Sequence, residues 1–190
     1  MYSTLYDMVN EYLLETIAGQ FGLATLKQLN AAGVSKSSVM GYANRGTLTK
    51  VAYGVYRLSA FPSEEFEDYM LAILWAQGRG VIVDQSALVL WDLCDVNPRE
   101  IHLGIPKSYR PRKAINPLYC LHKLDYDSFV FGKHLNIPVM QPYDAISRCI
   151  DSGMRSDLLN QAIETAYSLR HLSDLDKSRL TVQLEDGVKI

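Results

Sequence analysis

The sequence lacks any long apolar run, and no stretch reaches the ~18 residues that a membrane span requires. Residues 1–15, MYSTLYDMVNEYLLE, carry acids and have no basic segment, so they do not predict a secretory signal. These two absences predict a cytoplasmic protein with no membrane partner.

Cysteine is scarce, and Cys94, Cys120 and Cys149 are too far apart to form a C-x-x-C pair. An odd, scattered set predicts buried thiols in a reducing compartment rather than a disulfide framework. Cys120 and His122 occupy alternate positions, which share one face of a strand and could supply two metal ligands. Nothing nearby in the sequence completes a set of four. We therefore predict no metal and no cofactor.

Catalytic motifs are also missing: the chain has no G-x-S-x-G, no P-loop and no H-E-x-x-H. Several acids lie close together in the sequence: Asp84, Asp92, Asp95 and Glu100. However, no lysine follows an acid at the end of a strand with the spacing that is typical of a nuclease. Scattered histidines are more often structural than catalytic, and the chain has four: His102, His122, His134 and His171. We predict that the protein is not an enzyme. The alternative is a DNA-targeted nuclease or nucleotidyl-transferring enzyme.

Acidic residues are absent from one part of the chain. Between Thr16 and Ser63 there is no Asp or Glu, yet this segment holds Lys27, Lys36, Arg45, Lys50 and Arg57. The whole chain carries a net charge of only −2, so the positive charge is local. A cationic module in a nearly neutral chain is typical of a protein that docks on phosphates; chance clustering on a solvated surface is the alternative.

The cationic segment has the pattern of short helices. Apolar residues at helical spacing predict a first helix over residues 2–18. Thr25 and Ser35 are good N-caps for two further helices, over 26–32 and 36–45. A glycine follows each of these two helices and tolerates the left-handed conformation that often ends a helix. The result is a pair of helices joined by a tight turn.

A β-hairpin follows the pair of helices. Two β-prone runs, over 48–51 and 55–58, are separated by a short segment in which Gly54 supplies the turn. Two helices joined by a tight turn and followed by a hairpin form a winged helix-turn-helix. We expect this DNA-binding domain to occupy residues 1–62.

In a helix-turn-helix the second helix enters the major groove of DNA. Val39 and Ala43 are expected to face the core, and the opposite side of the helix to face DNA. Asn44 can pair with adenine through two hydrogen bonds, and Gly41 would let the backbone approach DNA closely. The alternative is a polar solvent face, with the mid-helix glycine costing about 1 kcal/mol. The expected DNA contacts, including three from the hairpin, are Lys36, Ser37, Met40, Gly41, Asn44, Arg45, Lys50, Tyr53 and Arg57.

The remainder of the chain predicts an α+β domain over residues 63–190. Ser63 is expected to cap a helix over 64–77 that buries Phe66, Met70 and Ile73. A short strand and a helix are expected next, over 81–83 and 87–94. Further strands are expected over 101–105, 119–124, 129–131 and 135–140, and closing helices over 142–151, 156–169 and 173–184. Strands in a run, followed by helices in a run, indicate a small, mostly antiparallel sheet.

A second basic cluster lies in the segment IPKSYRPRKAINP, where prolines and the lack of a helical period predict a loop. Such a loop could extend the DNA footprint, bind RNA or an acidic partner, or simply keep the surface solvated. Its cations are Lys107, Arg110, Arg112 and Lys113.

Three motifs resemble the AbiEi-type antitoxins of bacterial type IV toxin–antitoxin (abortive infection) systems, and the resemblance spans most of the chain. The most specific is R-G-x-L followed by V-x-x-G-V-Y, over Arg45–Tyr56. The S-A-L-x-L helix at Ser86–Leu90 and the I-P-K plus arginine loop at Ile105–Arg112 are the others. Where the family usually has a histidine before the S-A-L helix, this chain has Asp84-Gln85.

The resemblance implies a winged-helix repressor that binds inverted repeats in its own promoter. It also implies a C-terminal antitoxin domain that counteracts a nucleotidyltransferase-like toxin, often without a stable complex. The expected partners are therefore double-stranded DNA and, functionally, such a toxin.

Overall fold

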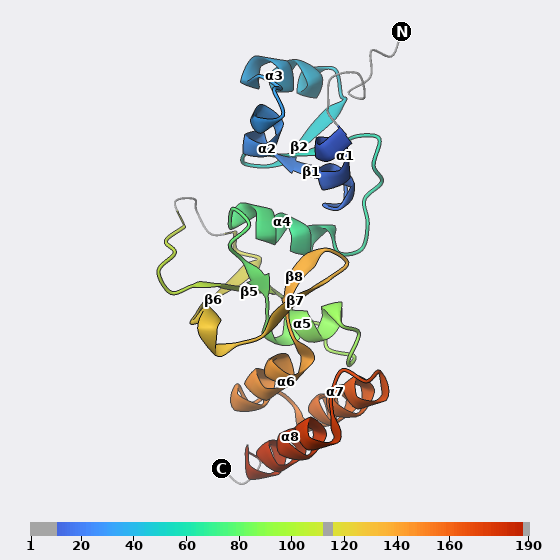
Figure 1. Ribbon diagram of the computed structural model, residues 1–190, viewed down its shortest axis with the longest axis vertical. Coiled ribbons are helices and arrows are strands. Elements are labelled where there is room, and N and C mark those ends of the chain that lie inside the picture. Colours follow the sequence, from blue (N-terminus) through green and yellow to red (C-terminus); the bar gives the residue numbers. More distant parts are fainter. Residues whose placement is uncertain (1–10, 112–115, 188–190) are drawn as a thin grey trace. The chain divides into compact units, whose positions relative to one another are not determined.

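The computed structural model describes residues 11–111 and 116–187 (Figure 1). The chain divides into two compact units, which meet between Gly78 and Arg79. The division follows helix α4, Glu67–Trp75, whereas the boundary expected after residue 62 precedes it. The predicted helical residues before position 11, and Arg112 and Lys113 of the basic loop, lie outside the described residues.

From residue 11 onward, the first unit contains α1 (Glu11–Ala18), α2 (Leu26–Ala31) and α3 (Lys36–Asn44) ahead of the hairpin segment, and the boundaries of α2 and α3 follow from their caps. Thr25 caps α2 in a complete capping box with Gln28, and the Ser35 hydroxyl accepts from the amide of Ser38 at the start of α3. Gly33 ends α2 with φ +88°, a conformation that residues with a side chain rarely adopt. The helices predicted over 26–32 and 36–45 are present, and each ends one residue earlier than predicted.

The first unit also contains a three-stranded antiparallel sheet of order β1-β3-β2, built from β1 (Leu23–Thr25), β2 (Leu48–Ala52) and β3 (Val55–Leu58). The predicted hairpin is β2–β3. Strand β1 was not predicted, since three residues are too few to show an alternating pattern. The apolar core of the unit lies between the helices and the sheet, and its buried residues are Leu13, Ile17, Ala24, Leu29, Val34, Val39, Tyr42, Leu48 and Leu58.

Helix α4 contacts strand β3, as expected if it braces the N-terminal module. It starts three residues later than predicted, and Ser63 is not its cap. The Ser63 hydroxyl donates instead to the Glu67 carboxylate, at 2.7 Å, and Phe66 at the N-cap position makes no side-chain capping bond. Met70 and Ile73 are buried as predicted, and Phe66 is half-buried.

The second unit is built on a five-stranded sheet of order β6-β5-β4-β8-β7. Its strands are β4 (Val81–Ile82), β5 (Ile101–Pro106), β6 (Tyr119–Leu124), β7 (Phe131–His134) and β8 (Ile137–Met140). The pairs β5–β6 and β4–β8 are parallel, and β4–β5 and β7–β8 are antiparallel. The sheet is therefore mixed, and the prediction of a mostly antiparallel sheet is wrong. The α+β class itself is confirmed.

The β7–β8 hairpin differs from the prediction. Leu135 and Asn136, expected inside a strand, both have positive φ (49° and 62°) and form the turn between the two strands. Such a pair is typical of the tight turns whose twist suits a hairpin. The turn was not predicted because Leu135 is apolar and fits the pattern of a strand. A short 3₁₀ turn, Tyr126–Ser128, precedes the hairpin.

The described residues of the second unit also form four α-helices: α5 (Asp84–Leu90), α6 (Pro142–Asp151), α7 (Ser156–Ser168) and α8 (Asp174–Gly187). Helix α5 contacts β5, β8 and α6, and α6 in turn contacts α7 and α8 (Figure 1). Helix α5 thus lies beside strand β5, and α6 lies beside α5. No helix among the described residues is both long and apolar enough to cross a membrane.

Candidate functional site

Helix α3 presents one polar face to solvent. Its inner side is formed by Val39 and Tyr42, which are buried as part of the core. We define the α3–hairpin face as the exposed predicted DNA contacts of α3, its C-cap and the adjacent hairpin: Lys36, Ser37, Met40, Asn44, Arg45, Lys50 and Tyr53. Helix α3 packs on β2, so the hairpin adjoins it within the same unit.

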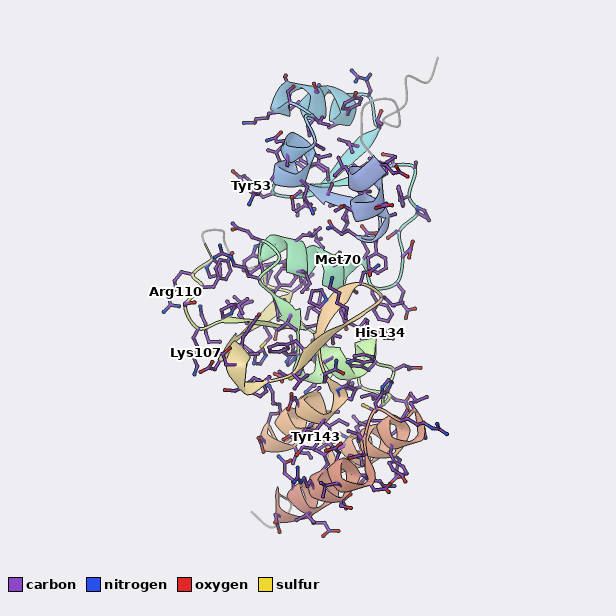
Figure 2. All side chains as sticks on the ribbon, in the orientation of Figure 1. Tyr53, Met70, Lys107, Arg110, His134 and Tyr143 are labelled. Carbon is purple, nitrogen blue, oxygen red and sulfur yellow. The ribbon has the colours of Figure 1, made fainter. Side chains whose placement is uncertain are left out.

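The hairpin contributes a cation and an aromatic ring. Tyr53 in the turn is 76% exposed, and the Lys50 ammonium lies 5.9 Å from its ring centre (Figure 2). Gly54 beside it has φ +72°, which the turn requires. An exposed lysine and tyrosine at a hairpin tip are suited to contact a phosphate backbone.

Gly41 has a role within the helix itself. A Cβ atom at this position would lie 3.3 Å from Nη1 of Arg45, whose guanidinium lies 4.9 Å from the centre of the Tyr42 ring. The glycine therefore leaves room for the Arg45 side chain along α3. This gives a reason for a mid-helix glycine that does not depend on close approach of DNA, the role predicted for it.

Arg57 is held away from the α3–hairpin face. Its Nη1 lies 3.2 Å from Oε2 of Glu67, a carboxylate that is almost fully buried. The pair joins β3 to α4 within the first unit. The Arg57 guanidinium, which was predicted to contact DNA, is therefore already paired with Glu67. Arg57 is not among the proposed DNA contacts.

The described part of the basic loop is folded on itself. Arg110 donates hydrogen bonds to the carbonyls of Lys107 and Tyr109, and Lys123 of strand β6 also donates to the Tyr109 carbonyl. Lys107 pairs at 3.5 Å with Asp125, and both side chains are more than half exposed. The loop keeps an exposed cationic surface, with Lys107 and Arg110 as its described members.

A buried ion pair in the second unit was not predicted. Asp84, at the start of α5, accepts two hydrogen bonds from Arg148 of α6, from Nε at 2.6 Å and from Nη2 at 3.0 Å. The side chains are 10% and 24% exposed. Sixty-four positions separate the two residues in the chain, so no local pattern could reveal the pair.

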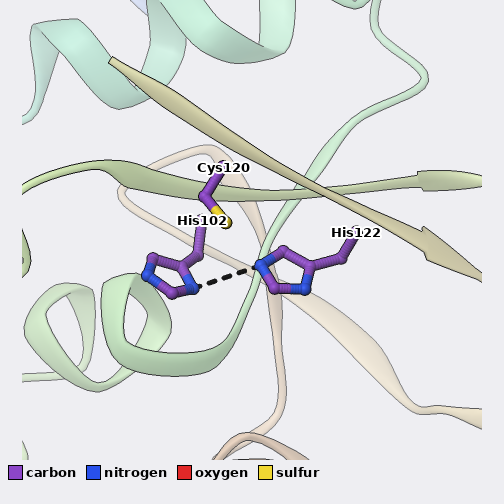
Figure 3. Close-up of side chains that lie close together, drawn as sticks. All are labelled: His102, Cys120 and His122. Atoms are coloured by element: carbon purple, nitrogen blue, oxygen red, sulfur yellow. Dashed lines mark hydrogen bonds between the residues drawn. The ribbon is translucent and has the colours of Figure 1, made fainter. Parts of the chain in front are cut away.

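Two histidines lie against this ion pair. Because β5 and β6 are parallel, His102 stands opposite Cys120, and His122 follows Cys120 by two positions on the same face. Nδ1 of His122 lies 3.3 Å from Oδ2 of Asp84, and Nε2 of His122 lies 3.2 Å from Nδ1 of His102 (Figure 3). The two rings are stacked, with centres 5.1 Å apart.

These contacts set the ionisation of the group. Burial alone would raise the pKa of Asp84, but the interactions with His102, at 3.9 Å, and with Arg148, together with nearby positive charge, lower the pKa to about 2. Burial lowers the pKa of His122 and outweighs the opposing effect of Asp84. Burial also raises the pKa of the Cys120 thiol. Near neutral pH the carboxylate is therefore charged and His122 is neutral.

The sequence indicates only part of this arrangement. Cys120 and His122 share one strand face in the sequence pattern, but the pattern does not identify the neighbouring strand that supplies the third ligand. His102 comes 18 positions before Cys120, and only the parallel register places them side by side. The sulfur of Cys120 and one nitrogen of each histidine lie within 4.8 Å of one another (Figure 3).

No protein-family model and no curated protein matches this chain. Its fold is similar to that in the crystal structure of the RV2827C protein from Mycobacterium tuberculosis. The TM-score is 0.52 with 13% sequence identity, over 94% of this chain and 78% of the other. At that identity the likeness concerns the fold alone.

Proposed function

We propose that the protein binds double-stranded DNA through the α3–hairpin face and acts as a winged helix-turn-helix repressor. The observation that carries the proposal is the exposed polar side of α3, which lies beside the hairpin in a segment without a single carboxylate. DNA attracts such a surface because each neutralised phosphate releases condensed counterions. No exposed acid in the segment opposes that attraction.

The residues of the face divide by chemistry into two groups. Asn44 can read an adenine edge through paired hydrogen bonds, and Met40 can contact a thymine methyl group. Lys36, Ser37 and Lys50 suit phosphate oxygens, which position the protein without reading sequence. We thus assign base reading to the exposed side of α3 and contact with the DNA phosphate backbone to the hairpin.

The proposed regulatory context follows from the family resemblance over Arg45–Tyr56 and Ile105–Arg112. The protein would repress its own promoter at inverted repeats and counteract a nucleotidyltransferase-like toxin. The first unit would carry repression. The second unit, with its exposed basic loop, would carry the antitoxin role.

The direct test compares two substitutions on the face. Asn44→Ala is expected to lose about 1–3 kcal/mol of binding free energy for DNA from the protein's own promoter and little for unrelated DNA, because a base contact is sequence-specific. Lys50→Ala is expected to weaken both alike. Fluorescence anisotropy with the two duplexes measures this difference.

The matched control is Asn30→Ala, which removes the same kind of exposed side chain from α2, outside the face. It should leave affinity unchanged. A uniform loss for Asn44→Ala across both duplexes would show that α3 does not read bases from this side.

A second test concerns the basic loop. Replacing the four loop cations with serine is expected to abolish protection against the co-expressed toxin: Lys107, Arg110, Arg112 and Lys113. Repression of a promoter reporter should persist, because loop charges contribute little to stability and the fold should remain intact. Growth and reporter activity are scored in the same cells. The control variant replaces four exposed cations elsewhere in the second unit and should protect the cells fully against the toxin. These cations are Arg99, Lys133, Arg170 and Arg179. Full protection by the loop variant would place the antitoxin surface elsewhere.

A further inference from the structure

We propose that His102, Cys120 and His122 of the second unit bind a zinc ion. These side chains project from two hydrogen-bonded strands onto one face of the sheet (Figure 3). Two imidazoles and a thiolate are the nitrogen and sulfur ligands that Zn²⁺ prefers, whereas Mg²⁺ and Ca²⁺ take oxygen. The proposal is independent of DNA binding, because all three residues lie outside the first unit.

The spacing of the nitrogens fits one ion. Two nitrogen ligands at about 2.0–2.1 Å from a tetrahedral zinc lie roughly 3.3 Å apart. Nε2 of His122 and Nδ1 of His102 are 3.2 Å apart. Sγ of Cys120 and one nitrogen of each ring lie within 4.8 Å of one another, against roughly 3.6 Å between sulfur and nitrogen in a tetrahedral site. The proposed site therefore requires the Cys120 side chain to move closer to the two rings.

The outer partners orient His122 as a zinc ligand. Its Nδ1 faces the carboxylate of Asp84 at 3.3 Å, so the proton belongs on Nδ1 and the lone pair on Nε2. Histidine ligands of metals almost always donate their other nitrogen to such a partner. Arg148 holds Asp84 through two hydrogen bonds, which fixes the carboxylate in that position.

The same groups are satisfied without a metal. His102 Nδ1 can donate to His122 Nε2, and His122 Nδ1 to Asp84, so a chain of hydrogen bonds links neutral rings to the carboxylate. Zinc takes the lone pair of His102 Nδ1 as the proton of that ring moves to its Nε2, so both rings stay neutral, and zinc displaces the thiol proton of Cys120, which passes to solvent. All three ligand residues are partly exposed, which gives the ion a path of entry. Three protein ligands leave a fourth position for water.

The test uses the full chain after treatment with a chelator. Calorimetric titration is expected to give one Zn²⁺ per chain, with a buffer-dependent enthalpy that reports proton release. With Co²⁺ in place of Zn²⁺, we expect tetrahedral d–d absorption and a thiolate-to-metal charge-transfer band. The Cys120→Ser variant is expected to lose the charge-transfer band and to bind at least ~10-fold more weakly, while its circular dichroism is unchanged.

The matched control is Cys94→Ser, which removes another half-buried thiol of the same unit and should retain the band and the affinity. His122→Gln provides a second variant that must also weaken binding. The proposal is overturned if the wild-type chain binds no zinc at micromolar concentration. It is equally overturned if Cys120→Ser leaves the band intact, or if Cys94→Ser abolishes it.

Discussion

Replacing Asp84 with asparagine is expected to lower the free energy of unfolding by about 3 kcal/mol, in the range found when one partner of a buried ion pair is removed. The substitution leaves the Arg148 guanidinium, which is 24% exposed, without its carboxylate. Asparagine is the suitable replacement because residue 84 has φ +51°, which asparagine tolerates and alanine does not. Urea denaturation of the metal-free chain measures the loss.

Two further variants separate burial from charge. Asp125→Asn breaks the exposed pair with Lys107, both more than half exposed, and should change stability by well under ~1 kcal/mol. The double variant Asp84→Asn with Arg148→Met removes both buried charges and should recover part of the loss. Equal effects of Asp84→Asn and Asp125→Asn would mean that the buried pair contributes no more than a surface pair.

The same ion pair makes stability depend on pH. The pKa of Asp84 is lowered from its ordinary value of 3.8 to about 2 in the folded chain. A lowered pKa stabilises the fold above pH ~4, and this contribution, roughly 2–3 kcal/mol, is lost as pH falls toward 2. The Asp84→Asn variant should show a correspondingly shallower fall in stability between these pH values.

Raising the salt concentration from about 50 to about 200 mM is expected to weaken binding to promoter DNA on the order of 40-fold per chain. This value assumes about three phosphate contacts and a slope of roughly −0.9 per contact on logarithmic axes. The cations of the α3–hairpin face supply that number, since Arg57 is paired with Glu67: Lys36, Arg45 and Lys50.

A single lysine should contribute a countable share of that slope. Lys50→Ala is expected to reduce the slope by about 1, whereas Lys133→Ala, an exposed lysine of the second unit, should leave it unchanged. Affinity measured over several salt concentrations provides both values. Affinity that does not vary with salt would contradict the proposal that this face binds DNA.

The helix pair of the first unit could be predicted because its determinants are local. The Thr25 and Ser35 caps act on amides within three residues, and Gly33 ends a helix through its own φ. Strand β1 was not predicted because it forms only by pairing with β3, whose partner residues come 30 to 34 positions later. The predicted strand directions in the second unit were wrong for the same reason. The sequence of a strand does not show which neighbouring strand it pairs with, or in which direction.

By itself, the sequence determined the capped helices, the β2–β3 hairpin and the absence of acids around them, because caps, turns and charge depend on neighbouring residues. Only the tertiary structure decided that Glu67 engages Arg57 and that His102 meets Cys120 and His122 beside Asp84. Those contacts depend on strand order, direction and register. Strand order, direction and register are fixed by the packing of the whole unit, which brings residues that are distant in the sequence into contact.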